Sequence, residues 1–356
     1  MTERSITFRE AINDALRLEM RRDSRVVLLG EDIAGGASLE HIEGKEDEAW
    51  GGSMGVTKGL VQEFGRRRVL DTPISESGYI GAAVGAAATG LRPVAELMFV
   101  DFFGVCMDQI YNQGAKLRYM FGGKAEVPLT IRSMIGAGFR TAGQHSGSHY
   151  SVFTHMPGLK TVVPSTPRDA KGLMAAAIRD NDIVVFFEHK LLYDVEGLVP
   201  DGEFVIPLGK ADIKRNGKDV TVIAIGRMVT LALEAANVLE TERGISVEVV
   251  DPRTLSPLDE DTLLSSVRRT HHVVVIDEDH PRCSVATDIV ALIATKALEY
   301  LDEAPQMVTA PHTVVPFSPV LEDLYVPSVA RIKQAILTRA IPRPSASRLS
   351  ITTCSG

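Results

Sequence analysis

The chain has 356 residues, enough for two domains with cores of their own. Lys and Arg number 38 against 46 Asp and Glu, a net charge of −8 with no basic block, which argues against nucleic-acid binding. Three cysteines without a CxxC pair exclude a disulfide framework and a thiolate zinc site. No apolar run approaches the roughly 18 residues of a membrane span, and no signal segment opens the chain. We therefore expect a cytoplasmic protein.

Short apolar runs alternate with helical patterns through the first half of the chain. This alternation is typical of a parallel α/β sheet with helices on both faces. It predicts an N-terminal domain over residues 1–195. The predicted strands cover residues 26–30, 69–72, 93–99, 128–134, 161–164 and 183–188.

The pattern loosens around Pro200, Gly202, Pro207 and Gly209, which predicts a linker over residues 196–217. Residues 218–340 then repeat the α/β scheme more compactly and predict a smaller second domain. Its strands are expected at 220–226, 247–251 and 272–277, and its helices at 228–242, 258–269 and 286–300. The final stretch, residues 341–356, is rich in serine and has little apolar periodicity, so we expect a disordered tail.

Carboxylates lie at or near the ends of several predicted strands, namely Glu31, Glu76, Glu96 and Glu188. Ligands of parallel sheets collect outside the carboxyl ends of the strands. One such acid is more often a helix cap or a solvated loop residue. Four at one sheet edge favour an acid-lined site.

A glycine-rich segment, residues 136–143, follows the predicted strand at 128–134. A dinucleotide loop is disfavoured because the third glycine is misplaced and no acid closes a second strand about 20 residues later. The next residues bring His145, His149 and His155, but no acid or thiolate accompanies them at metal-ligand spacing. On these residues alone, His145 suits either general acid–base catalysis or a structural role.

Several motifs together carry a resemblance that extends over about residues 6–336. They include LLGEDI, DTPISESGYIGAAVGAA, GLRPVAELMFVDF, QHSGS and VDPRTLSPLD. The chain resembles the beta subunit of the thiamine diphosphate-dependent first component of 2-oxo acid dehydrogenase complexes, in the transketolase-like superfamily. The resemblance implies a pyrimidine-binding domain of transketolase type followed by a transketolase C-terminal-like domain. The segments GAGFR, FFEHKLLYD, IGRMV and DEDHPRCSVATDI are most similar to members that cleave acetoin.

The same resemblance implies roles for individual residues. Glu76 matches the acid that hydrogen-bonds the cofactor's pyrimidine, and Phe102 matches the aromatic residue that stacks on it. Glu31 matches an acid in a chain of carboxylates and waters between paired active sites. His145 matches a loop histidine that assists proton transfer and acyl transfer to a lipoyl group. A structural potassium ion is expected at Leu129, Ala177, Asp180 and Asp182.

No GDG segment, which anchors magnesium and the diphosphate in self-sufficient relatives, occurs in the chain. The resemblance therefore implies half an active site, completed by an alpha subunit that holds Mg²⁺ in an α2β2 tetramer, with a lipoyl-bearing acyltransferase as the next partner. Acetoin would yield acetaldehyde and an acetyl group. The alternatives are oxidative decarboxylation of pyruvate or a branched-chain 2-oxo acid, and a non-catalytic α/β scaffold subunit, which the presence of Glu76 and His145 disfavours.

Overall fold

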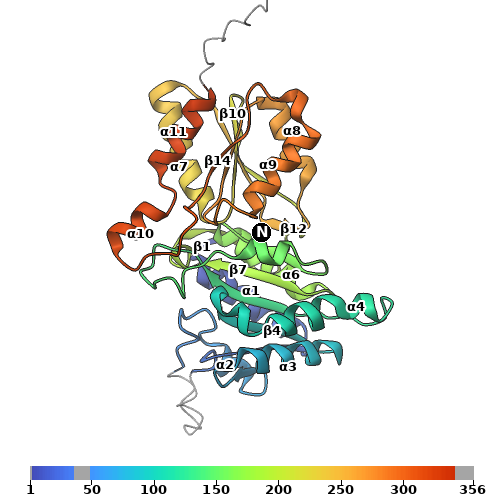
Figure 1. The fold of residues 1–356 in the computed structure, drawn as a ribbon. Coiled ribbons are helices and arrows are strands. Elements are labelled where there is room, and N and C mark those ends of the chain that lie inside the picture. The colour runs from blue at the N-terminus through green and yellow to red at the C-terminus, as the bar shows by residue number, and fades with distance from the viewer. Residues whose placement is uncertain (1, 36–48, 341–356) are drawn as a thin grey trace, which may run out of the picture.

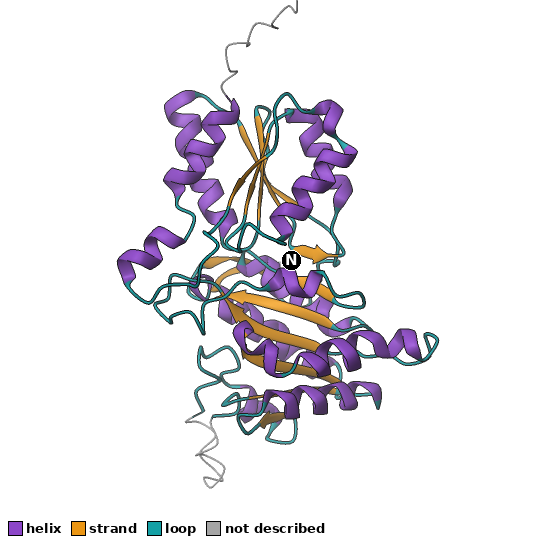
Figure 2. Cartoon of the chain, viewed as in Figure 1, coloured by secondary structure: helices purple, strands orange, loops and turns teal. Residues whose placement is uncertain are grey.

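The computed structural model describes residues 2–35 and 49–340, and it contains two α/β units (Figure 1). Each unit has a central sheet with helices against its faces (Figure 2). The tail expected at 341–356 lies outside the described residues. No helix among the described residues is both long enough and apolar enough to span a membrane.

The first unit is built on a seven-stranded sheet in the order β12-β6-β7-β5-β4-β2-β3. The six strands from the first half of the chain pair in parallel, which confirms the predicted parallel sheet. Every side chain of β2, β5 and β7 is buried, as expected of strands covered on both faces. The strands are β2 (Val26–Gly30), β3 (Val69–Asp71), β4 (Arg92–Phe99), β5 (Thr130–Ile135), β6 (Lys160–Val162) and β7 (Val184–His189).

Local signals define where the helices of this unit begin. Thr7 forms a capping box with Glu10 at the start of α1, and Thr166 caps α6 with Pro167 at its first position. These two helices pack against each other on one face of the sheet. The helices are α1 (Phe8–Arg22), α2 (Leu60–Phe64), α3 (Glu76–Ala88), α4 (Lys116–Met120), α5 (Tyr150–Thr154) and α6 (Pro167–Arg179). Segments of 3-10 helix are η3 (Val100–Val105) and η5 (Lys190–Leu192), and η4 (Gln109–Ala115) is a π-helix.

The second unit holds a five-stranded sheet in the order β14-β13-β10-β11-β9, parallel except for β9. Its predicted strands and helices are confirmed with small shifts at their ends. The strands are β9 (Asp212–Arg215), β10 (Val220–Ala224), β11 (Val247–Asp251), β13 (Val273–Ile276) and β14 (Gln306–Val308). The helices are α7 (Met228–Arg243), α8 (Glu260–Thr270), α9 (Val285–Lys296), η6 (Leu298–Tyr300), α10 (Pro319–Tyr325) and α11 (Val329–Ala340).

Two features differ from the sequence-based division into domains. The expected linker at 196–217 contains β8 (Glu196–Pro200), which pairs with β1 (Glu3–Thr7), and it also contains β9. In addition, β12 (Thr254–Ser256) leaves the second unit and pairs antiparallel with β6, at the edge of the first sheet. Both segments are short and only partly apolar, so partner strands distant in sequence determine their conformation.

Candidate active site

Two buried carboxylates, Glu31 and Glu76, lie where two neighbouring strands end. Glu31 directly follows β2, and Glu76 is the first residue of α3, shortly after β3. The exposed fractions are only 7% for Glu31 and 8% for Glu76. Burial and the negative charge of Glu76 raise the pKa of Glu31. The nearby Tyr79 hydroxyl acts in the opposite direction and lowers this pKa. The Oε1 atom of Glu31 is buried and makes no hydrogen bond of ordinary length with a described residue, so Glu31 can accept a further donor from outside the chain.

Phe102 and His145 both line a cavity of about 440 Å³. Phe102 lies on η3, which continues directly from β4, and its ring contacts the His145 ring edge-on at a centroid distance of 5.4 Å. Phe99 contacts the same imidazole at 4.6 Å. The hydroxyl of Ser77, next to Glu76 on α3, donates to the Val105 carbonyl of η3. The structure thus joins the carboxylate pair to the His145 cavity through η3.

Asp101 anchors the loop that carries His145. Its carboxylate accepts from the Gly147 amide, at 3.2 and 3.3 Å for its two oxygens. The Nε2 atom of His149 lies 3.7 Å from the same carboxylate, and Asp101 raises the pKa of this imidazole. Sequence reasoning did not single out Asp101, because it stands inside an otherwise apolar run after β4.

Glu96 and Glu188, both expected in the acid-lined site, are instead paired within the sheet by Arg132. Arg132 on β5 donates to Glu96 on β4 at 2.7 Å and to both oxygens of Glu188 on β7 at 2.7 and 2.8 Å. The Tyr193 hydroxyl donates to Glu188 at 2.8 Å. The charges of Glu188 and Glu96 raise the pKa of Arg132 despite its burial. These two acids therefore bind adjacent strands together, which corrects the expectation of four acids lining one cavity.

Further polar groups connect the two units near the His145 loop. Glu278, after β13, lies 2.9 Å from Nε2 of His189 and accepts from the Ala137 amide at 2.6 Å. The hydroxyls of Tyr150 and Ser151 donate to Asp277 and Asp279. The acidic run that directly follows the VVVI strand was the signal that could have identified this contact, since it marks the carboxyl end of the second sheet.

Comparison with known proteins matches both units. The pyrimidine-binding domain of transketolase matches residues 4–196, and the C-terminal domain of transketolase matches residues 209–332. The beta subunit of acetoin:2,6-dichlorophenolindophenol oxidoreductase from Bacillus subtilis is 62% identical over 334 residues, covering 94% of this chain and 97% of that protein. The chain belongs to the transketolase-like dehydrogenase beta subunits.

Other known proteins match less closely. The Cupriavidus necator protein with the same acetoin oxidoreductase name is 59% identical, over 93% of this chain and 96% of its own length. The pyruvate dehydrogenase E1 component subunit beta of Bacillus subtilis is 44% identical, over 91% of this chain and 95% of its own length. A solved split-gene transketolase, described as an inactive beta4 tetramer, shares the fold with a TM-score of 0.73 and 22% identity, over 94% of this chain and 98% of that one.

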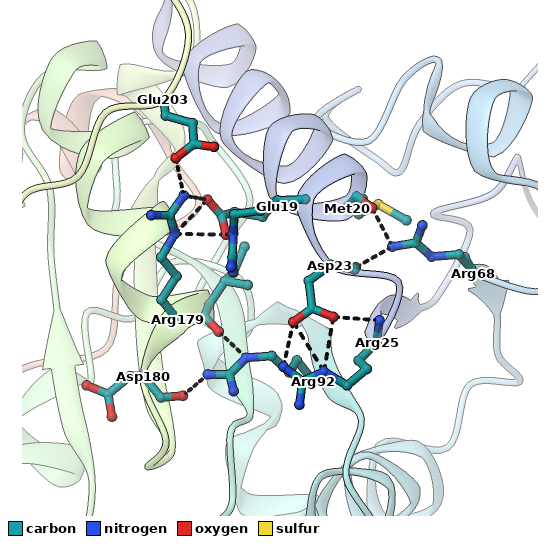
Figure 3. A network of polar contacts seen from close by, with 11 residues as sticks. Glu19, Met20, Asp23, Arg25, Arg68, Arg92, Arg179, Asp180 and Glu203 are labelled. Carbon is teal, nitrogen blue, oxygen red and sulfur yellow. Dashed lines mark hydrogen bonds and ion pairs between the residues drawn. The ribbon is translucent and has the colours of Figure 1, made fainter.

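The oxygens expected to hold potassium already have partners. The carbonyls of Leu129 and Ala177 accept from backbone amides. The Asp180 carbonyl accepts from Arg92, within the network of buried and half-buried charges in Figure 3. The side chains of Asp180 and Asp182 both pair with Lys160, and Asp182 also pairs with Arg118. A carbonyl oxygen has two lone pairs, so these contacts still leave room for a cation, and a potassium ion at these residues stays a prediction.

Proposed function

We propose that the chain is the beta subunit of a thiamine diphosphate-dependent acetoin dehydrogenase. Acetoin is cleaved between its carbonyl and carbinol carbons, and acetaldehyde leaves. The acetyl group and one hydrogen pass to the disulfide of a lipoyl group, which becomes an acetyl thioester and a thiol. Two observations support the substrate: the most similar relatives reported above carry the acetoin name, and the pyruvate relative is more distant.

The observation that carries the proposal is the buried pair Glu31 and Glu76, with an oxygen of Glu31 that lacks a donor. When bound, thiamine diphosphate supplies a nucleophilic thiazolium carbon. Glu76 would accept a hydrogen bond from the pyrimidine nitrogen and so favour the imino form of that ring. Burial and the charge of Glu76 raise the pKa of Glu31. Glu31 would therefore hold a proton readily, as a member of the chain of carboxylates and waters between paired active sites.

Phe102 would stack on the pyrimidine, and His145 would move protons at the substrate oxygen and at the lipoyl sulfur. His145 lines the open cavity, whereas Glu31 and Glu76 do not. This position is the one expected of a residue that contacts the substrate. An alpha subunit would supply the diphosphate and Mg²⁺ half of the site, because the GDG segment is absent from this sequence.

The test is an assay of the alpha–beta pair with acetoin, pyruvate and a branched 2-oxo acid, using dichlorophenolindophenol as electron acceptor. This acceptor bypasses the lipoyl core. We expect turnover with acetoin well above that with either 2-oxo acid. If the pair preferred pyruvate or the branched acid, the assigned substrate would change from acetoin to that acid. The thiamine diphosphate-dependent reaction of the family would still be assigned to the chain. Absence of turnover with all three, from a pair that binds the cofactor, would favour the scaffold alternative.

The purified chain alone should show no turnover with acetoin, and addition of its alpha partner should restore activity. Binding energy at the diphosphate end is needed to hold the reacting ring in place. The measurement is the acceptor-linked rate at increasing alpha-to-beta ratios. Activity of the isolated chain would contradict the shared site.

His145→Ala should slow transfer to the lipoyl acyltransferase by about 10²–10⁴-fold, because a general acid–base group is lost. The affinity for thiamine diphosphate should change little, because His145 is not one of the buried carboxylates proposed to contact the cofactor. The control is His155→Ala, which removes an exposed imidazole at the end of α5. Equal complex activity in the two variants would assign His145 a structural role.

A further inference from the structure

Lys190 is a buried lysine that touches the His145 loop directly. Lys190 directly follows β7 and is only 2% exposed. Its Nζ atom donates to the Thr141 hydroxyl at 2.9 Å and to the main-chain carbonyl of His145. The Thr141 hydroxyl in turn contacts the His145 carbonyl and the Ser146 hydroxyl, at 3.1 and 2.9 Å. One ammonium group thus connects the two ends of the turn that presents the imidazole.

No carboxylate among the described residues forms an ion pair with this ammonium group. The centre of the Phe99 ring lies 5.4 Å from Nζ, and this ring also contacts the His145 imidazole. Burial lowers the pKa of Lys190 to about 8. A buried lysine without a counter-ion contributes little to stability, so its contacts with the loop need another reason.

We propose that Lys190 is a positioning residue for His145: it fixes the main chain of the turn from Thr141 to Ser146 and so holds the imidazole against Phe99 and Phe102. This inference rests on the proposed function of His145. The lysine does not reach the cavity itself and acts through the loop.

The hold of Lys190 on the His145 loop should depend on pH. A protonated amine donates more strongly to the two loop oxygens than a neutral one does. As pH rises through the pKa of Lys190, the turn is held less firmly and activity should fall. Charged and titratable groups face Lys190 from several surrounding elements. Asp101 lies after β4, His145 lies on the loop, and His189, adjacent to Lys190 in the chain, pairs with Glu278. Glu322 of α10 pairs with Arg140.

The experiment compares Lys190→Met, Lys190→Arg and a control, Lys171→Met, in the reconstituted heterotetramer. Lys171 is also buried and also donates to a main-chain carbonyl, that of Pro200 at 2.6 Å, but it lies away from the loop. The first readout is the rate of tryptic cleavage after Arg140, which lies in the loop and is part-exposed. We expect K190M to be cleaved at least several-fold faster than the parent and K171M to be cleaved at the parental rate.

The second readout separates kcat from KM and follows both with pH. K190M should lower kcat at least tenfold with cofactor affinity unchanged. K190R should retain more activity than K190M and shift the alkaline limb to higher pH, because a guanidinium stays protonated. A double-mutant cycle of K190M with Thr141→Val provides a second route, since the two losses should be far from additive if they break one contact.

Parental cleavage after Arg140 in K190M would overturn the proposal. Equal loss of kcat in K190M and K171M, an unshifted alkaline limb in K190R, or additive losses in the cycle would also overturn it. The cleavage assay needs no substrate. If the parent heterotetramer proved inactive on acetoin, the proposed function would fail while this assay still decided whether Lys190 holds the loop.

Discussion

Glu76→Gln should reduce turnover of the reconstituted heterotetramer by about 10³-fold or more, while the fold and assembly are retained. The amide has almost the shape of the carboxylate, but it cannot share a proton with the pyrimidine nitrogen in the same way. The Ser75 side chain makes no capping bond at the start of α3, and Glu76 has a buried side chain there. The measurement is kcat with acetoin, with melting temperature and assembly state as checks on folding.

The alternative role of Glu76 is electrostatic support for the N-terminus of α3. In that case the glutamine variant would lose at most about 1 kcal/mol of stability and keep its rate. The control is Glu234→Gln, which removes an exposed carboxylate on α7. A Glu76→Gln variant as active as this control would exclude a chemical role.

Arg132→Met should destabilise the full-length chain by about 3–5 kcal/mol, because two buried carboxylates then lose their only cationic partner among the described residues. Burial already raises the pKa of Glu96. Without Arg132, burial should raise the pKa of Glu96 in the folded state further above its unfolded value. The cost of the substitution would therefore be largest at neutral pH and decrease as the pH falls and Glu96 takes up a proton.

The measurement is the free energy of unfolding in urea at several pH values. Arg118→Met is the control, since it breaks a part-exposed pair with Asp182 and should cost only about 0–1 kcal/mol. A cost for Arg132→Met equal to the control, or one that does not decrease toward acid pH, would contradict a buried charge network across β4, β5 and β7.

Most strands could be predicted from the sequence because apolar residues dominate each of them, even where a polar residue such as Glu96 or Arg132 lies inside the strand. The order of strands in the sheet depends on contacts between segments distant in sequence, and β12 pairs with β6 from more than 90 residues away. No local pattern encodes either feature. The same limit applied to the site. The place of Glu31 and Glu76 after β2 and β3 could be read from the sequence, and the structure shows both side chains buried there. Glu96 and Glu188 occupy similar sequence positions, but Arg132 on the strand between them neutralises both.

Lys190 illustrates the other kind of residue that sequence reasoning missed. It lies two residues after the end of the predicted strand at 183–188, where it resembles any polar residue that follows a strand. Only the fold shows that the loop from β5 returns over the end of β7 and places Thr141 and His145 within its reach. Burial of a lysine depends on tertiary contacts, so composition and periodicity carry no signal for it.

The most direct test of the account is the rate of deuterium exchange at the thiazolium carbon of thiamine diphosphate bound to the reconstituted heterotetramer. This rate reports activation of the cofactor before any substrate binds. The account predicts fast exchange in the parent and in Glu234→Gln, and exchange slowed by about 10²-fold or more in Glu76→Gln. Exchange in Glu76→Gln as fast as in the parent would show that the buried acid at the start of α3 does not activate the cofactor.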